Sequence, residues 1–291
     1  MHIVLHAGVH ATDEDRLIKC FLKNTQAFAA LGVAVPGPSR YRRLLRDTLH
    51  AMAEGDLAPD ARAVLLDAIL EGDTPDRMIL SNDSFFGTPK MSVGKGVFYP
   101  GAELKMVRLR RLFPQDSIEL CLGLRNPATF VPAVFALAPD TDLMDFMNGT
   151  DPLDLRWSEL ITRIKDAVPD IEITLWCNED TPLIWAYLVR ELAGLAPNTK
   201  IIGGFDLIAE IMSKTGMQRF RSYLKSHPSM TEIQKRRVIA AFLDKYALDD
   251  AIEEEVDLPG WTHDLIRLMT ETYEEDIFRI QRMSGVELIS P

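Results

Sequence analysis

The sequence predicts an α/β fold, a three-layer sandwich in which helices flank a parallel sheet and a helical C-terminal region follows. Four short apolar runs have the aliphatic composition of buried parallel strands: 3–5, 78–80, 118–124 and 171–176. Helical patterns separate these runs, and alternating strands and helices form βαβ units with right-handed crossovers. Beyond about Gly203 the alternation stops. We therefore expect an α/β domain over 1–203 and a helical C-terminal region over 204–291 that packs on it.

The first predicted helix spans 14–31, where apolar residues such as Leu17 and Phe21 recur at spacings of three and four. Gly32 closes this helix, and a Pro-Gly-Pro turn follows at 36–38. The other helices expected in the α/β domain lie near 40–53, 58–71, 101–112, 127–137, 156–168 and 182–193.

The C-terminal region has helical patterns from 205 to 283, with breaks at 227–228 and 258–260. A short strand is expected at its end, over 286–289. The acidic run 249–257 is interpreted as a solvated face or loop.

Composition narrows the classes of partner. The net charge is -11, from 43 acidic and 32 basic residues, and this disfavours nucleic acid and anionic lipid as ligands. The three cysteines are too scattered for a disulfide framework or a zinc site, so no metal is expected. The N-terminus lacks the pattern of a signal peptide, and no apolar run approaches the ~20 residues of a membrane span. A cytoplasmic protein whose partner is a small molecule or another protein is expected.

The segment 6–16 leads from the first strand into the first helix and has a glycine at its turn. In open α/β sheets, ligands bind beyond the carboxyl ends of the strands, where a loop feeds a helix. The positive end of that helix and its unbonded backbone N–H groups attract phosphate. This loop is therefore the first candidate site.

The segment resembles the 5′-phosphosulfate loop of sulfotransferases, particularly the bacterial sulfotransferase-like group, whose pattern is H-x-G-x-x-K-T-G-T/S-T/S. His6, Gly8 and Thr12 match this pattern. The resemblance implies a P-loop-type fold, that of the P-loop nucleoside triphosphate hydrolase superfamily, and the donor 3′-phosphoadenosine 5′-phosphosulfate. If the donor binds, the residues implied to hold it are Gly8, Val9, His10, Thr12 and Arg125.

Three later segments support the resemblance, which spans roughly 2–195. The stretch 79–83 looks like the second-strand segment of the family, and 176–185 is similar to a segment that recurs in the bacterial group. The stretch 122–127 resembles a strand that ends in R-D-P. There the family's arginine, here Arg125, is implied to contact the 3′-phosphate of the donor.

Substitutions within the loop change its chemistry. The lysine of the pattern falls on Ala11, the second glycine on Asp13, and the hydroxyl positions on Glu14 and Asp15. The cation is thus lost, a Cβ and carboxylates are added, and like charges repel an anion. These acids suit the N-terminus of an unliganded helix, with Thr12 or Asp13 as the expected N-cap. A standard nucleoside triphosphate loop would also need a glycine at Asp13 and a lysine at Glu14.

The second phosphate site is altered in the same way. The family serine that holds the 3′-phosphate falls on Ala133, so Arg125 remains alone. Arg125 could still meet an anion, but pairing with Asp13, Glu14 or Asp83 is favoured, because an unpaired buried arginine is costly.

Three functional hypotheses follow. The leading one is a sulfotransferase-like protein with a degenerate donor loop, weak or inactive, in a binding or scaffold role with no certain cofactor. The alternative is an active sulfotransferase that transfers a sulfuryl group to a hydroxyl or amine acceptor, with His10 as general base. The third is a transferase or hydrolase whose chemistry has moved to Ser81, Asn82 and Glu179.

Several residues also have plain structural readings. His10 is interpreted first as a loop residue hydrogen-bonded to the backbone, and His6 as a satisfied core histidine. Two arginine-rich runs, at 40–46 and 108–111, are interpreted as solvated helix faces because the protein is acidic overall.

Overall fold

The computed structural model describes residues 1–291 apart from 56, 140–141 and 253–257. A six-stranded parallel sheet has the strand order β2-β3-β1-β6-β7-β8. Its strands are β1 (His2–His6), β2 (Val33–Ala34), β3 (Arg77–Ser81), β6 (Ser117–Leu124), β7 (Glu172–Cys177) and β8 (Val286–Ile289). The four predicted internal strands and the short C-terminal strand are confirmed. The edge strand β2 and the small hairpin β4 (Val93–Gly94) and β5 (Val97–Phe98) were not predicted.

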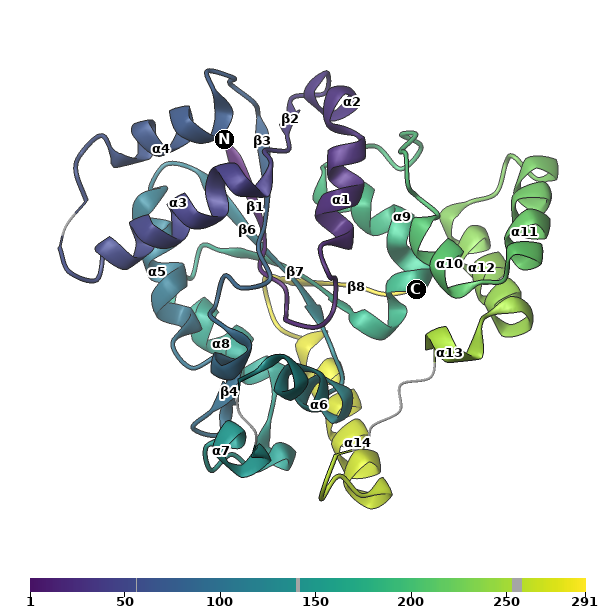
Figure 1. Cartoon of the computed structure of the whole chain (residues 1–291). Coiled ribbons are helices and arrows are strands. Elements are labelled where there is room, and N and C mark those ends of the chain that lie inside the picture. The colour runs from purple at the N-terminus through teal and green to yellow at the C-terminus, as the bar shows by residue number, and fades with distance from the viewer. Residues whose placement is uncertain (56, 140–141, 253–257) are drawn as a thin grey trace.

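Helices cover both faces of the sheet (Figure 1). Those of the first two thirds are α1 (Arg16–Lys23), α2 (Thr25–Ala29), α3 (Pro38–Ala51), α4 (Ala61–Leu70), α5 (Ala102–Leu112), α6 (Pro127–Leu137), α7 (Leu143–Met147), α8 (Trp157–Ala167) and α9 (Thr181–Leu192). Strand alternation explains the two layers: Ile3 and Leu5 join the core beneath α3, α5 and α8, whereas Val4 joins the core beneath α1 and α9. The predicted sheet flanked by helices is therefore present.

The predicted helix 14–31 is wrong in its extent, because the structure has α1 and α2 in its place. Asn24 interrupts it with a buried side chain. The amide of Asn24 donates to the carbonyls of Cys20 (2.8 Å) and Ile202 (2.9 Å) and accepts from the Ile202 N–H (2.7 Å). This bonding ties the helix to a loop far along the chain.

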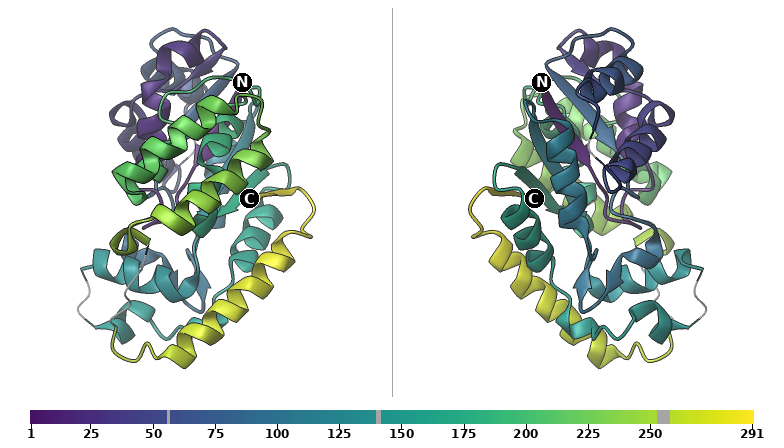
Figure 2. Two further views of the ribbon diagram at one scale, coloured as in Figure 1. Left: turned by 90° about the vertical axis from the view of Figure 1, so that its right-hand side faces the viewer. Right: turned by 90° about the vertical axis from the view of Figure 1, so that its left-hand side faces the viewer.

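The C-terminal third begins with four helices: α10 (Asp206–Ile211), α11 (Lys214–Ser226), α12 (Glu232–Tyr246) and α13 (Asp249–Ile252). Phe220 and Ile239 belong to a small core of their own between these helices. The chain then returns to the sheet through α14 (His263–Ile280) and β8, which pairs with β7 (Figure 2). The predicted breaks fall between α11 and α12 and before α14; of the acidic run, 253–257 lies outside the described residues. Among the described residues, no helix is long and apolar enough to cross a membrane.

The buried side chain of Asp276 connects α14 to the start of α8. Asp276 is 4% exposed. Its carboxylate accepts a hydrogen bond from the Ser158 N–H at 3.0 Å and another from the Ser158 hydroxyl. A carboxylate at a helix N-terminus is stabilised by the helix dipole and by the unbonded N–H groups.

Replacing this carboxylate is predicted to destabilise the protein. Asp276→Ala leaves the Ser158 N–H and hydroxyl buried without an acceptor, and each such group costs about 1–3 kcal/mol. Urea denaturation should show a loss of about 2 kcal/mol or more in the free energy of unfolding. The control Glu275→Ala changes an exposed neighbour on the same helix and should have little effect. Equal stability of both variants would contradict the assigned role of Asp276.

Candidate functional site

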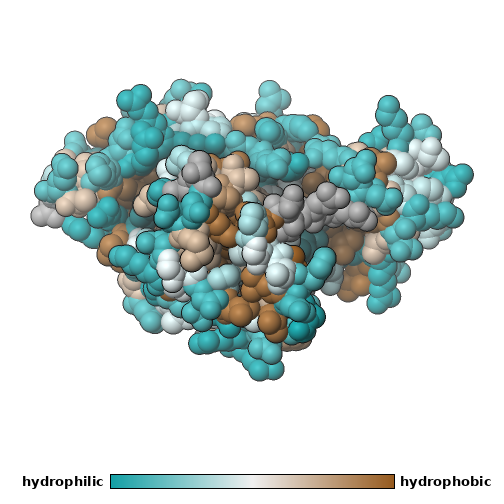
Figure 3. Space-filling model, turned by 60° about the horizontal axis from the view of Figure 1, so that its bottom comes forward, coloured by the Kyte–Doolittle hydropathy of each residue, from teal (hydrophilic) through white to brown (hydrophobic). Residues whose placement is uncertain are grey.

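A pocket of about 460 Å³ lies at the carboxyl ends of β1, β6 and β7. From β1 the chain runs to β2 and β3 on one side of β1, and it then crosses to β6 and β7 on the other side. The order of the strands therefore reverses at β1. Seen from this edge, hydrophobic side chains gather toward the middle of a mostly hydrophilic surface (Figure 3). The lining residues used below are Thr12, Asp13, Arg16, Asn126, Trp176, Glu179 and Trp185.

The loop after β1 forms one wall of this pocket, and its first residues are bonded into the sheet. The Ala7 N–H donates to the Cys121 carbonyl (3.1 Å), and the Gly123 N–H donates to the Gly8 carbonyl (2.9 Å). A longer bond joins the Val9 N–H to the Gly123 carbonyl (3.5 Å). The parallel pairing of β1 with β6 thus continues past the end of β1, and it occupies backbone N–H groups that a phosphate would need.

Gly8 allows this course of the chain. Its φ is +99°, and a Cβ at this position would lie 3.2 Å from the Cα and the carbonyl oxygen of Asp83. Residue 8 therefore has to be glycine for local reasons of packing and backbone conformation, whether or not a ligand binds.

His10 is buried and faces away from the pocket. Its Nε2 donates to the Gly87 carbonyl at 3.1 Å, and its Nδ1 accepts from the Tyr99 hydroxyl at 2.9 Å. The same hydroxyl accepts from the His10 N–H at 3.1 Å. Burial lowers the pKa of His10, which favours this neutral tautomer. The structural reading of His10 agrees with these contacts, and both ring nitrogens are already engaged.

His6 lies at the end of β1, beneath the pocket. Its Nδ1 lies 2.9 Å from the Ser81 hydroxyl, and its ring stacks on Trp176 at a centroid distance of 5.7 Å. The expected satisfied core histidine is wrong in one respect: Nε2 is buried and has no hydrogen-bond partner among the described residues. Burial lowers the pKa of His6, because the charged form loses its hydration.

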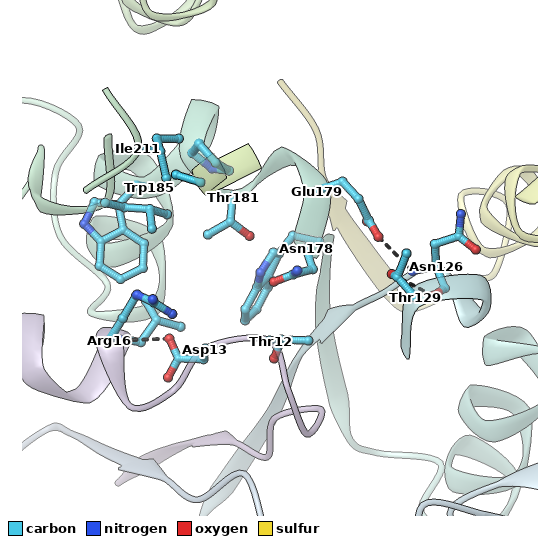
Figure 4. A pocket seen from close by; sticks show the side chains of 15 residues that line it. Thr12, Asp13, Arg16, Asn126, Thr129, Asn178, Glu179, Thr181, Trp185 and Ile211 are labelled. Carbon is cyan, nitrogen blue, oxygen red and sulfur yellow. Dashed lines mark hydrogen bonds between the residues drawn. The ribbon is translucent and has the colours of Figure 1, made fainter. Parts of the chain in front are cut away.

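Asp13 accepts a hydrogen bond from the first turn of α1 but is not its N-cap. Its Oδ1 accepts the Leu17 N–H at 2.8 Å. The N-cap position is Asp15, whose side chain makes no capping hydrogen bond, so the predicted N-cap at Thr12 or Asp13 is wrong. The Thr12 hydroxyl instead donates to the Val9 carbonyl at 2.6 Å and so is no cap. Asp13 also lines the pocket, and burial raises the pKa of its carboxyl. A carboxylate therefore lies in the wall of this pocket (Figure 4).

Three non-glycine residues of the loop have left-handed backbone conformations. Their φ angles are 56° for Ala11, 50° for Glu14 and 62° for Asp15. Such residues cost of order 1 kcal/mol each and occur preferentially at functional sites. Side-chain ion pairs hold two of them, Glu14 to Arg16 at 3.1 Å and Asp15 to Arg42 at 2.5 Å.

Arg125 lies against the loop from the end of β6. Its guanidinium donates to the Ala11 carbonyl and to the Thr129 hydroxyl, the latter at 3.1 Å. The carboxylates of Asp13 and Glu14, expected as its ion-pair partners, bond to Leu17 and Arg16 as described above. Asp83, the third expected partner, accepts from the Ser84 hydroxyl at 3.1 Å. Arg125 therefore fastens the loop through a backbone carbonyl.

Glu179 follows β7 on the opposite side of the pocket. Its Oε1 accepts the Asn126 N–H at 2.8 Å, and its Oε2 accepts the Tyr273 hydroxyl at 3.2 Å. Burial raises the pKa of this carboxyl. Ser81 and Asn82, predicted to act with Glu179, lie elsewhere: Ser81 is buried against His6, and Asn82 lines a separate groove. The third hypothesis therefore loses its convergent set of polar groups.

The pocket offers little to an anion. Among the described lining residues the charged groups are Asp13, Glu179 and Arg16, and Arg16 already pairs with Glu14 (3.1 Å) and Glu210 (3.0 Å). Figure 4 shows Thr12 and Asp13 across the pocket from Trp185 and Ile211. Of the five residues implied to hold the donor, only Thr12 lines this pocket as the described residues form it.

The sequence did not single out Arg16, Asn126 or Trp185 as pocket residues. Their positions in the sequence could have indicated a pocket, because Asn126 follows a buried strand and Arg16 is the first residue of the first helix. Trp185 enters from α9, and nothing in its spacing distinguishes a pocket wall from core.

A group of possible metal ligands lies at the opposite ends of the strands from the pocket, near the amino-terminal ends of β1, β6 and β7. His2, Glu119 and Glu172 come within metal-binding reach of one another. The Glu119 Oε2 lies 2.9 Å from His2 Nε2 and 3.1 Å from the guanidinium of Arg77. Arg77 already supplies the positive charge that a metal would bring, so this group is explained as an ion-pair network.

The raised pKa of Asp13 predicts a pH-dependent stability. A carboxyl whose folded-state pKa lies above its unfolded value stabilises the fold only where it is protonated, and this contribution is lost as pH rises through the folded pKa. Asp13→Asn keeps an oxygen for the Leu17 N–H and removes the buried charge. The variant should unfold at higher urea than the wild type at pH 7, by about 1.4 kcal/mol for each unit of pKa shift.

The same comparison near pH 3.5 provides the control, because there the advantage of Asp13→Asn should vanish. Glu14→Gln, at an exposed position of the same loop, should change stability little at either pH. A destabilised Asp13→Asn variant at pH 7 would contradict the assignment of a desolvated carboxylate.

No protein-family model matches the chain, and neither does any curated protein. The parallel sheet, the loop after β1 and the pocket beside it are therefore the observations on which a function can rest.

Proposed function

We propose that this protein is a degenerate relative of the sulfotransferases, with a P-loop-type fold, that binds a small molecule or a protein at the pocket and transfers no sulfuryl group efficiently. The position of the loop supports the kinship, because 6–16 joins the first strand to the first helix at the reversal of strand order. His6, Gly8, Thr12 and Arg125 stand where the family pattern has them. The proposal includes a cytoplasmic location, which fits three free cysteines.

The observation that carries the loss of donor binding is the internal bonding of the loop. The N–H groups of Ala7, Val9 and His10 all donate within the protein. Hydrogen bonds to a charged group are worth about 1.5–3 kcal/mol each, so a loop that has committed these donors forgoes much of its affinity for phosphate. Asp13 adds a like charge at the same turn, where repulsion from an anion amounts to about 1–4 kcal/mol at ~4 Å.

The alternative, an active sulfotransferase, is favoured by one observation. Arg125 lies against the Ala11 carbonyl, so a cation remains beside the loop. The contacts of His10 oppose this alternative, because a general base needs a ring nitrogen within reach of the acceptor. An acceptor would first have to displace the Tyr99 hydroxyl or the Gly87 carbonyl.

Calorimetry with 3′,5′-adenosine bisphosphate tests the proposal. The wild type should show no binding at micromolar concentrations. The double variant Ala11→Lys with Asp13→Gly restores the cation and the bare backbone of the family pattern, and it should gain at least tenfold in affinity. Ala27→Lys adds the same charge at an exposed position of α2 and should gain nothing.

Micromolar binding of this nucleotide by the wild type would contradict the proposal and support the active enzyme. A wild type that does not bind, together with a double variant that gains nothing, would show that the backbone of the loop itself has been remodelled. In that case the protein would still be a relative that has lost donor binding, but Ala11 and Asp13 would not be the cause of the loss.

A further inference from the structure

The two arginine-rich runs of the sequence meet at one groove in the fold. Helices α3 and α5 pack against one another (Figure 1), and the loop after β3 closes one end of the space beside them. The groove has a volume of about 650 Å³, within the range of small-molecule sites. It is distinct from the pocket at β6 and β7, since the two have no lining residue in common.

Positive charge dominates the groove of this acidic protein. The lining residues include five cations and the single acid Asp47: Arg42, Arg43, Arg46, Lys105 and Arg108. Arg42 pairs with Asp15 at 2.5 Å, and Arg43 and Arg46 share Asp47 at 3.4 and 2.9 Å. Three of the five cations are therefore already paired, with two carboxylates between them.

Lys105 and Arg108 differ from the others. They lie three residues apart on α5, hence on one face of the helix, and both are half-buried. Lys105 donates to the Phe85 carbonyl at 3.0 Å, and Arg108 donates to the Leu49 carbonyl at 3.4 Å. No carboxylate of the described residues pairs with either. Desolvation and the charge of Arg108 lower the pKa of Lys105, so the two cations destabilise each other where they stand.

The remaining wall of the groove is apolar. Leu45 and Leu49 come from α3, Phe85 from the loop after β3, and Met91 from the turn that follows. Met91 is 49% exposed and so is accessible to a bound molecule, whereas Leu45, Leu49 and Phe85 are only 1%, 5% and 5% exposed and lie behind it. A ligand made only of phosphate or sulfate would leave this wall uncovered.

We propose that this groove binds a small organic anion whose carboxylate, phosphate or sulfate group lies between Lys105 and Arg108 and whose apolar body covers Met91. Lys105 and Arg108 lie on one helix face without a carboxylate partner among the described residues, so an anionic group could bind between them. A charge-assisted hydrogen bond is about twice as strong as a neutral one. The adjoining apolar wall requires a hydrophobic body on the same molecule. The inference does not depend on the function proposed for the other pocket.

Calorimetry with decyl phosphate below its critical micelle concentration tests the inference on the full chain. Binding is expected at micromolar concentrations and should weaken at least tenfold in Lys105→Gln and in Arg108→Gln. Arg111→Gln changes an exposed arginine of the same helix that does not line the groove, and it should bind within twofold of the wild type. Met91→Gln removes the apolar contact without adding a charge that would repel the anion, and it should also lose tenfold or more.

Thermal unfolding of each variant identifies any that fails to fold, and Met91→Gln keeps the test valid if the two helix variants do not fold. Methyl phosphate supplies the anion without the apolar body and should bind at least tenfold more weakly than decyl phosphate. Absence of decyl phosphate binding to the wild type would overturn the inference. Equal binding by folded groove variants, or equal affinity for methyl phosphate, would overturn it as well.

Discussion

The backbone pairing that extends β6 alongside residues 7–9 is the constraint on which the candidate site depends. Because the Gly123 N–H and the Cys121 and Gly123 carbonyls hold this segment, the loop cannot open into a ring of outward N–H groups. The pairing also turns His10 inward toward Tyr99 and brings the next residues out at the pocket, where Asp13 accepts a hydrogen bond from the first turn of α1. The loop therefore has a structural role, and a ligand in the pocket would meet the carboxylate of Asp13.

The distribution of charge differs between the two sides of the loop after β1. Toward β6 and β7, the carboxyls of Asp13 and Glu179 line the pocket, and burial raises the pKa of both. Toward β3, Arg42 pairs with Asp15, while Lys105 and Arg108 have no carboxylate partner within the part of the chain that the structure describes. The loops after β1 and β3 thus separate an acidic cavity from a basic one, although the protein as a whole carries a net charge of -11.

Most of the fold could be predicted from local sequence, because buried parallel strands and amphipathic helices have periodicities that residue types reveal. The break at Asn24 could not, since it depends on hydrogen bonds to Ile202, far away in the chain. The same limit applies to the candidate site. The hydrogen bond of Asp13 to the first turn of α1 is local, yet the predicted N-cap was wrong because the helix begins later, with Asp15 at the N-cap position. The bonds of Arg125 to the loop and the packing of α3 on α5 depend on tertiary structure.

The edge strand β8 has a consequence for biosynthesis. Ile173 pairs with Val286, so the ribosome must synthesise all of α10 to α14 before the open side of β7 is covered. Until then a nascent chain exposes the unpaired N–H and C=O groups of a hydrophobic strand, a template for pairing with another molecule. Contacts of such long sequence separation also slow folding. A chain released before β8 is synthesised would carry this open strand edge into solution.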